Sequence, residues 1–308
     1  MKINPSISFR RVLRCALIIT GFCLVADTGF AQIKGHSKMR EEIATIAASS
    51  KGKVGISIKI LESGDTLSYH ADARYPMQSV FKFPIAVSIL RAVEKGRLNL
   101  DDKILVTKKD LRKTVSALLE KYPNGNQKVS IREMLTDMVT LSDNNACDIL
   151  MRTLGGPQKI TADIHGVGVI DIMIVGDETQ MNADWSLQYR NWSKPSAQVQ
   201  LLSVLYQGKL LSASGTKMLI NLMEHTFVAP KRIQGLLPSG TVIAHRSGTS
   251  GTDEKGLSPA TNDVGVITLP NGKHLAIAIF VSDSYLPDDK RDEVVAKIAK
   301  AAFDEFVQ

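Results

Sequence analysis

The sequence predicts an α+β protein. Its antiparallel β-sheet is built from both ends of the chain and flanked by terminal helices, and an all-helical domain is inserted in the middle. Residues 54–60 and 66–70 alternate between apolar and polar side chains, as half-buried strands do. Comparable strand patterns return only after residue 241. Between about 79 and 223, apolar residues recur mainly at helical spacing.

The first 31 residues have the features of a signal peptide. An apolar run over 15–25 is too short to span a bilayer. Gly29 and Ala31 place small residues at the −3 and −1 positions of a cleavage site after Ala31. The basic residues before the apolar run are Lys2, Arg10, Arg11 and Arg14. No later segment is long and apolar enough to be an anchor, so we expect a periplasmic protein that is not bound to the membrane.

Removal of that peptide lowers the formal net charge from +7 to +4. No basic cluster with interleaved aromatic residues indicates a nucleic-acid groove. Cys147 is then the one remaining cysteine, which excludes an internal disulfide, and we expect a buried structural thiol. The six histidines lack the spacing of a metal site. We therefore expect no metal or other cofactor, and a monomer.

The N-terminal elements follow from periodicity and turn residues. Residues 37–48 place apolar side chains on one face of a helix. The strand 54–60 and its partner 66–70 are joined by the turn Ser63-Gly64-Asp65, which predicts a hairpin. Pro76 favours an extended segment before it, which leads the chain to Ser79.

In the middle of the chain, a helix that starts at Ser79 should end before Gly96. A mixed connection, 101–107, follows it. Ser130 and Glu133 form a capping-box pattern for the next helix. Three further helices are expected, from the Ser142-Asp143-Asn144 break to Leu154, over 196–207 and over 213–225. The stretch 166–194 has few helix signals and is interpreted as a long ordered loop, a kind of segment that is usually functional.

The C-terminal part returns to strands at 241–247, 263–269 and 274–282. The last two are joined by Pro270-Asn271-Gly272, a strong hairpin signal. An amphipathic helix over 292–306 ends the chain. The predicted organisation is a signal peptide at 1–31, an α/β domain formed by 32–77 and 224–308, and a helical domain at 78–223.

Ser79 and Lys82 are the first candidate catalytic pair. A serine three residues before a lysine at a helix start places both side chains on one face, beside free backbone N–H groups. Alone, the pattern is weak, because serine is also a common helix cap. Pro84 lies close behind, where it cannot donate to the carbonyl of Val80. We therefore expect an irregular turn there, with that carbonyl bonded elsewhere or to water.

Other chemically distinctive groups follow in order. Each has an ordinary interpretation as a cap, a solvated side chain or a turn, and their joint appearance is what indicates a site. They are Ser142-Asp143-Asn144 between helices, Glu178 and Asn182 in the long loop, Arg232, and Arg246-Ser247-Gly248-Thr249 at a strand end.

These motifs resemble the class A serine β-lactamases, over essentially the whole chain after residue 31. The segments Pro76–Lys82, Gly235–Pro238 and Ala260–Asp263 are most similar to the PER/VEB-type extended-spectrum branch. The resemblance implies the fold that these enzymes share with penicillin-binding proteins. It also implies hydrolysis of the β-lactam amide through an acyl-enzyme, with resistance to the antibiotic as the result.

The resemblance assigns a role to each catalytic residue. Ser79 is the nucleophile, and either Lys82 or Glu178 is the base for acylation. Glu178 activates the deacylating water, which it holds together with Asn182. Backbone N–H groups of Ser79 and Thr249 form an oxyanion hole, a contribution of about 3–4 kcal/mol.

Ser142 is expected to pass a proton to the lactam nitrogen. The substrate-binding residues implied by the resemblance contact either the side-chain amide or the carboxylate of the substrate. They are Asn144 for the amide, and Arg232, Arg246, Ser247, Gly248 and Thr249 at the carboxylate.

Three positions depart from the usual family pattern. Arg246 and Ser247 replace a lysine and a threonine, which affects carboxylate binding and the proton path to Ser142. Asp148 replaces an asparagine that braces the loop of the catalytic glutamate. We therefore expect an altered loop around Glu178 and a roomier site that admits oxyimino-cephalosporins.

Two other functions use a similar serine. A penicillin-binding D,D-peptidase acylates in the same way but lacks the glutamate-and-water device, whereas Glu178 and Asn182 supply one here. A non-hydrolysing β-lactam sensor would normally need a transmembrane signalling segment. Steady turnover of a chromogenic β-lactam distinguishes hydrolysis from both alternatives.

Overall fold

A computed structural model describes residues 35–307, so the predicted signal peptide lies outside the described residues. Within this range the main sheet has the strand order β2-β1-β10-β9-β8 and is antiparallel throughout. Its strands are β1 (Lys53–Ile60), β2 (Thr66–Tyr69), β8 (Ile243–Thr249), β9 (Thr261–Thr268) and β10 (His274–Ser282). The prediction of an antiparallel sheet built from both ends of the chain is confirmed.

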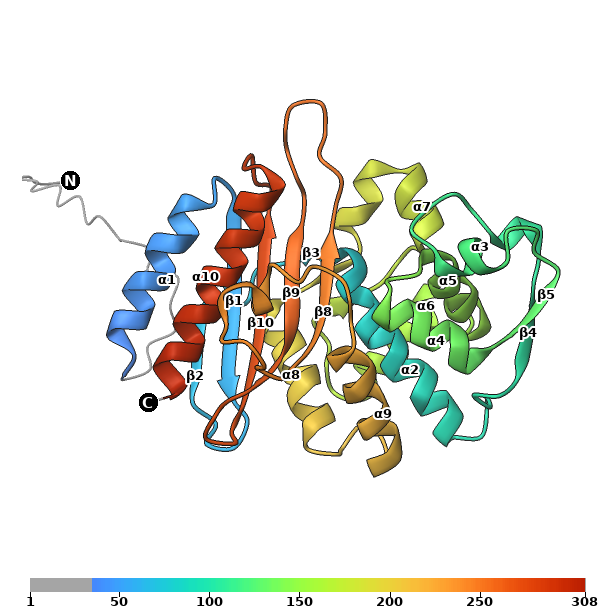
Figure 1. The fold of residues 1–308 in the computed structure, drawn as a ribbon, viewed down its shortest axis with the longest axis horizontal. Coiled ribbons are helices and arrows are strands. Elements are labelled where there is room, and N and C mark those ends of the chain that lie inside the picture. The colour runs from blue at the N-terminus through green and yellow to red at the C-terminus, as the bar shows by residue number, and fades with distance from the viewer. Residues whose placement is uncertain (1–34, 308) are drawn as a thin grey trace, which may run out of the picture.

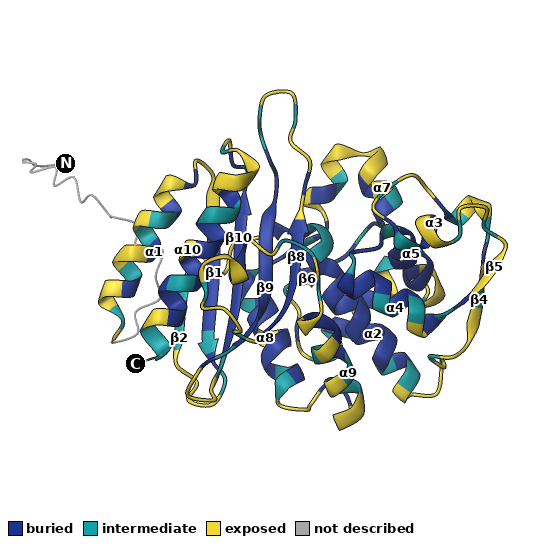
Figure 2. Cartoon of the chain, in the orientation of Figure 1, coloured by how far each residue is buried: buried dark blue, intermediate teal, exposed yellow. Residues whose placement is uncertain are grey.

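The helices α1 (Ser37–Ser49) and α10 (Asp288–Val307) cover one face of this sheet (Figure 1). Their apolar stripes, which include Ile43 of α1, share one core with side chains of the strands, such as Ile58 of β1 and Ile277 of β10. The outer sides of both helices are exposed, whereas the sheet between the layers is buried (Figure 2). The terminal helices are therefore the predicted flanking layer.

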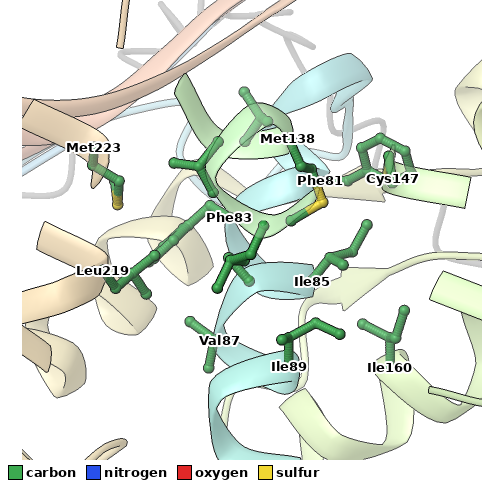
Figure 3. Packing of buried hydrophobic residues seen from close by; sticks show 14 of the residues in the cluster. Phe81, Phe83, Ile85, Val87, Ile89, Met138, Cys147, Ile160, Leu219 and Met223 are labelled. Carbon is green, nitrogen blue, oxygen red and sulfur yellow. The ribbon is translucent and has the colours of Figure 1, made fainter. Parts of the chain in front are cut away.

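The helix α8 (Pro195–Tyr206) packs against β1 and β10, and the other helices lie beside the edge strand β8 (Figure 1). These helices share one apolar core with that face of the sheet. Figure 3 shows α2 in this core: its own Phe83, Ile85 and Ile89 are packed among side chains of other helices, such as Met138 of α4 and Ile160 of α6. The remaining α-helices are α2 (Lys82–Glu94), α3 (Ala117–Lys121), α4 (Ile131–Thr140), α5 (Asn144–Thr153), α6 (Pro157–His165), α7 (Glu178–Ala183) and α9 (Ala213–Glu224).

The turn at Ser79 is irregular, as expected. A 3₁₀ helix, η1 (Gln78–Phe81), precedes α2, which begins at Lys82. Pro84 is therefore the third residue of α2, where its missing N–H would have had no intrahelical acceptor. The Val80 carbonyl is contacted by the Lys82 N–H, which also reaches the Ser79 carbonyl. The turn is not a regular α-helix, and the partner of the Val80 carbonyl lies outside the i→i−4 ladder that Pro84 interrupts.

Some of the local expectations needed correction. The connection 101–107 contains β4 (Lys103–Val106), which pairs with β5 (Gln127–Ser130). Only half of the expected capping box forms: the Ser130 hydroxyl accepts from the Glu133 N–H, but the Glu133 carboxylate accepts from the Tyr122 hydroxyl. The stretch 166–194 contains α7, the 3₁₀ helix η3 (Trp185–Tyr189) and two short strands. These strands, β6 (Ile172–Met173) and β7 (Trp192–Ser193), form a small sheet with β3 (Tyr75–Pro76).

Candidate active site

Ser79 and Lys82 lie on the same side of the turn from η1 into α2. Side chains three residues apart eclipse in a 3₁₀ helix, which aligns this pair. The Lys82 Nζ atom is 3.1 Å from the Ser79 Oγ atom. Lys82 is fully buried, so its amine meets the serine in the absence of bulk water.

The Lys82 amine has more oxygen neighbours than it has protons. Hydrogen bonds reach Ser79 Oγ, the carbonyl and Oγ of Ser142, and Asn144 Oδ1. Glu178 Oε1 lies 2.8 Å away, at ion-pair distance but without hydrogen-bond alignment. An ammonium group has only three N–H donors. At least two of these five oxygens therefore receive no proton from Lys82 at any one time, which suits a site that moves protons.

The segment 142–144 supplies a second hydroxyl opposite the nucleophile. Ser142 has a φ of 61°, in the left-handed region that non-glycine residues rarely adopt. Its Oγ lies 3.1 Å from Ser79 Oγ. The Asp143 carboxylate accepts from the Ala146 N–H and so caps α5, and this bond fixes the segment 142–144 at the start of that helix. The conformation of the break is therefore set by its own cap.

Glu178 is the first residue of α7, and Asn182 lies one helical turn further on. Both residues line the same cavity. Glu178 is buried, whereas Asn182 is exposed. Asp177 caps the helix in a capping box with Gln180, which is a local signal that this loop contains a helix.

The strand β8 passes directly against the nucleophile turn. A Cβ atom on Gly248 would lie 2.3 Å from the Met77 carbonyl oxygen and 3.1 Å from the Ser79 nitrogen. Only glycine allows this approach. Ser247, Gly248 and Thr249 all line the cavity.

Arg246 is fully buried on β8 and donates to the Ser142 hydroxyl. Burial lowers the pKa of Arg246 to about 10, so the guanidinium is still charged near neutral pH. Among the described residues, its Nε and Nη1 atoms have no hydrogen-bond partner. The structure thus places a cation beside Ser142, and its contact with a substrate carboxylate stays a prediction.

Arg232 is also buried, behind β8. Its guanidinium donates to Asp292, to the carbonyls of Gly248 and Asn262, and to the Thr249 hydroxyl at 2.7 Å. Arg232 therefore holds the end of β8 and the Thr249 side chain. Its predicted contact with the substrate carboxylate is not tested by these bonds.

A cavity of about 670 Å³ lies in front of these groups, and Lys82, Arg232 and Arg246 stand behind its wall rather than in it. Ser79, Ser142, Asn144 and Glu178 are all in its wall. Large apolar side chains at its rim are exposed, namely Val115, Trp185 and Phe227. The structure therefore brings together the motifs that the sequence separates by up to about 170 residues.

A sequence model described as the β-lactamase enzyme family matches residues 38–306. The chain belongs to this family. β-Lactamase VEB-1 of Pseudomonas aeruginosa is 37% identical over 86% of this chain and 89% of the relative. The extended-spectrum β-lactamase PER-1 of the same species is 32% identical over 95% of each chain.

Solved structures agree with this assignment. The crystal structure of TLA-3 extended-spectrum β-lactamase is 42% identical and matches with a TM-score of 0.87, over 89% of this chain and 100% of that one. A β-lactamase from Chitinophaga pinensis is 43% identical, with a TM-score of 0.85 over 87% and 98% of the chains. The expected resemblance and the predicted fold class are both confirmed.

Asp148 holds the start of α7 in this β-lactamase. Its two carboxylate oxygens accept from the Glu178 N–H at 2.8 Å, the Thr179 N–H at 3.1 Å and the Thr179 hydroxyl at 2.8 Å. Both oxygens are used, which an asparagine could not match because one of its positions is a donor. Local sequence patterns could not reveal this contact, since Asp148 and Glu178 are 30 residues apart, and only the family resemblance linked Asp148 to the loop of the glutamate.

The same carboxylate predicts a pH-dependent stability. Burial, reinforced by Asp177, raises the pKa of Asp148 from 3.8 to about 6, against the hydrogen bonds from Thr179 and Glu178. The folded protein thus holds this proton more tightly than the unfolded chain. The stability from this group is complete below pH 3.8 and is lost as pH rises through about 6.

We therefore expect wild-type protein to lose stability relative to Asp148→Asn, by at most about 3 kcal/mol, between about pH 4 and pH 7. Denaturant unfolding of both proteins at several pH values measures the difference. A difference that stays constant across this range contradicts the prediction.

The rim residues and Gln78 were not predicted as part of the site. Gln78 has a φ of 47° and donates to the Gln188 side chain at 2.6 Å, linking the nucleophile turn to η3. The one sequence signal for these rim residues was the presence of aromatic residues, such as Trp185, in the long stretch 166–194. Within 35–307, no three His, Cys, Asp or Glu side chains converge as metal ligands would.

Proposed function

We propose that this β-lactamase opens penicillins and cephalosporins, including oxyimino-cephalosporins, through an acyl-enzyme on Ser79. The observation that supports the proposal is that Ser79, Ser142 and Glu178 line one cavity and that the buried Lys82 amine contacts all three. Each of them offers a group that the reaction needs, and no cofactor takes part.

In acylation, Ser79 Oγ attacks the lactam carbonyl and loses its proton to a base. Lys82 in its neutral form is in contact, and Glu178 can act through a water molecule. The N–H groups of Ser79 and Thr249 stabilise the oxyanion. The C–N bond then breaks, and the nitrogen takes a proton from Ser142. Lys82, which contacts Ser142, returns a proton to it, so that the proton lost by Ser79 ends on the leaving nitrogen.

In deacylation, Glu178 removes a proton from a water molecule held between it and Asn182. The hydroxide attacks the ester carbonyl, and Ser79 leaves with a proton. The burial of Glu178 beside Lys82 supports this role, because the carboxylate has an adjacent cation and faces the cavity.

Substrate recognition uses β8 and the segment after Ser142. In this proposal Ser247, Gly248 and Thr249, which line the cavity, bind the substrate carboxylate, and Arg246 and Arg232 supply positive charge behind them. Asn144 also lines the cavity and would bind the side-chain amide.

The cavity volume and the Asp148-held loop support turnover of oxyimino-cephalosporins. The names of the relatives PER-1 and TLA-3, both called extended-spectrum, support it further. We also propose an exported, periplasmic monomer whose signal peptide is cleaved near Ala31. In the described part of the chain, no helix combines the length and apolar character needed to cross a membrane.

Steady hydrolysis of nitrocefin is the expected result of the first assay. A burst equal to the enzyme concentration, without turnover, would instead indicate the D,D-peptidase or the sensor. Ceftazidime and cefotaxime should then be hydrolysed alongside penicillins. Fast penicillin turnover with negligible turnover of both cephalosporins would overturn the extended-spectrum part of the proposal.

A further inference from the structure

Asn262 lies on β9 directly opposite Gly248 of β8 and is fully buried. Its side-chain Nδ2 donates to two consecutive main-chain carbonyls, Pro76 at 2.8 Å and Met77 at 3.2 Å. Paired residues on neighbouring strands point to the same face of a sheet. The absence of a side chain on Gly248 therefore leaves space for Asn262 to reach the segment that precedes the nucleophile.

That segment needs an external support. Gln78, between the clamped carbonyls and Ser79, has a φ of 47°, in a region that costs energy for a residue with a side chain. The Met77 carbonyl also accepts from the Val80 N–H at 3.3 Å, a long bond. Asn262 thus adds the contact that fixes this turn against the sheet.

The two ends of the Asn262 amide are treated differently. Both protons of Nδ2 have carbonyl partners, whereas Oδ1 is buried and has no hydrogen-bond partner among the residues that the structure describes. A buried acceptor without a partner is unfavourable. Asn262 is therefore held in place by its donors alone, and both of them reach the segment before Ser79.

The main chain of Asn262 is part of the same arrangement. Its carbonyl accepts from Arg232 Nη1 at 3.0 Å, and the same nitrogen donates to the Gly248 carbonyl at 3.0 Å. Asn262 therefore connects the end of β8, which carries Thr249, to the turn that carries Ser79. These are the two residues whose N–H groups must point at one oxygen atom.

We propose that Asn262 is a positioning residue that sets the Ser79 N–H group against the Thr249 N–H group to form the oxyanion hole. The inference depends on the proposed function, because the hole acts on the tetrahedral intermediate of acyl transfer. Asn262 does not touch the substrate. It acts through the carbonyls of Pro76 and Met77.

The test compares Asn262→Ala and Asn262→Asp with wild type. Alanine removes both donors, and aspartate keeps the shape while placing a carboxylate oxygen against two carbonyl oxygens. We expect kcat/KM for nitrocefin to fall about tenfold to a hundredfold. The Kd of phenylboronic acid, whose adduct on Ser79 places an oxygen in the hole, should rise by a similar factor.

Ser284→Ala is the matched control. Ser284 is a buried hydroxyl on the sheet side that donates to the Ser50 carbonyl, so its loss removes a comparable side-chain clamp on the main chain. This variant should lose stability but keep the wild-type kcat/KM and boronate affinity. Thermal unfolding of every variant shows whether it is folded. If Asn262→Asp does not fold, Asn262→Ala still tests the inference.

Folded Asn262→Ala protein with kcat/KM and boronate affinity within twofold of wild type would overturn the inference. An equal loss in Ser284→Ala would overturn it too, because the effect would then be structural. Wild-type turnover alone tests the proposed function, whereas the ratio of variant to wild type tests Asn262.

Discussion

Glu178→Ala protein is expected to remain acylated on Ser79 after it is mixed with a penicillin. Without this carboxylate, the water at Asn182 has no base, whereas Lys82 still contacts the nucleophile and can assist acylation. General bases typically contribute about 10²–10⁴-fold, so deacylation should slow by a comparable factor. Intact-protein mass spectrometry should show a mass increase equal to the intact penicillin.

The double variant Ser79→Ala with Glu178→Ala is the control for the site of attachment, and it should show no added mass. Turnover by Glu178→Ala at the wild-type rate would mean that another group activates the water. Rapid loss of the adduct would lead to the same conclusion.

Lys82→Met is expected to slow acylation itself. The substitution keeps the length of the buried side chain but removes the nitrogen that contacts Ser79, Ser142 and Asn144. The proton of the nucleophile then lacks its nearest acceptor, and we expect kcat/KM to fall about 10²–10⁴-fold. Single-turnover kinetics with nitrocefin measures this step directly.

Lys95→Met is the matched control, because Lys95 is the exposed C-cap residue directly after α2 and does not line the cavity. It should leave kcat/KM unchanged. Lys82→Met also leaves the buried Glu178 without its cation, so denaturant unfolding should accompany the kinetics. Wild-type acylation by folded Lys82→Met protein would exclude the lysine as a necessary base.

Local patterns predicted much of the fold. The alternation in 54–60 and the Pro270-Asn271-Gly272 turn correspond to β1 and to the β9–β10 hairpin, within one or two residues at most ends. Such elements are determined by side chains that are neighbours in the sequence. The Ser79–Lys82 spacing is of the same kind, because three residues fix which side chains share a face.

Contacts between distant segments were the part that sequence could not supply. The pairing of β4 with β5 joins residues such as Ile104 and Val129, and neither strand has a strong pattern of its own. The carboxylate of Asp148 meets the Glu178 N–H only after α5 and α7 are packed together. Arg232 shows the same difficulty. The sequence around it did not indicate that its guanidinium would donate four hydrogen bonds to other groups of the protein.

Polar atoms that lack partners have a consequence for how this protein can be improved. Four buried polar atoms of β8 and β9, the two strands beside the cavity, have no hydrogen bond in the described structure. They are Arg246 Nε and Nη1, Ser247 Oγ and Asn262 Oδ1. Buried polar atoms without partners lower the free energy of unfolding, so in this region changes that increase stability are expected to reduce activity. Selection for heat resistance alone should therefore favour apolar replacements on β8 and β9 that abolish activity. Variants that are both more heat-resistant and active should carry their substitutions outside these two strands.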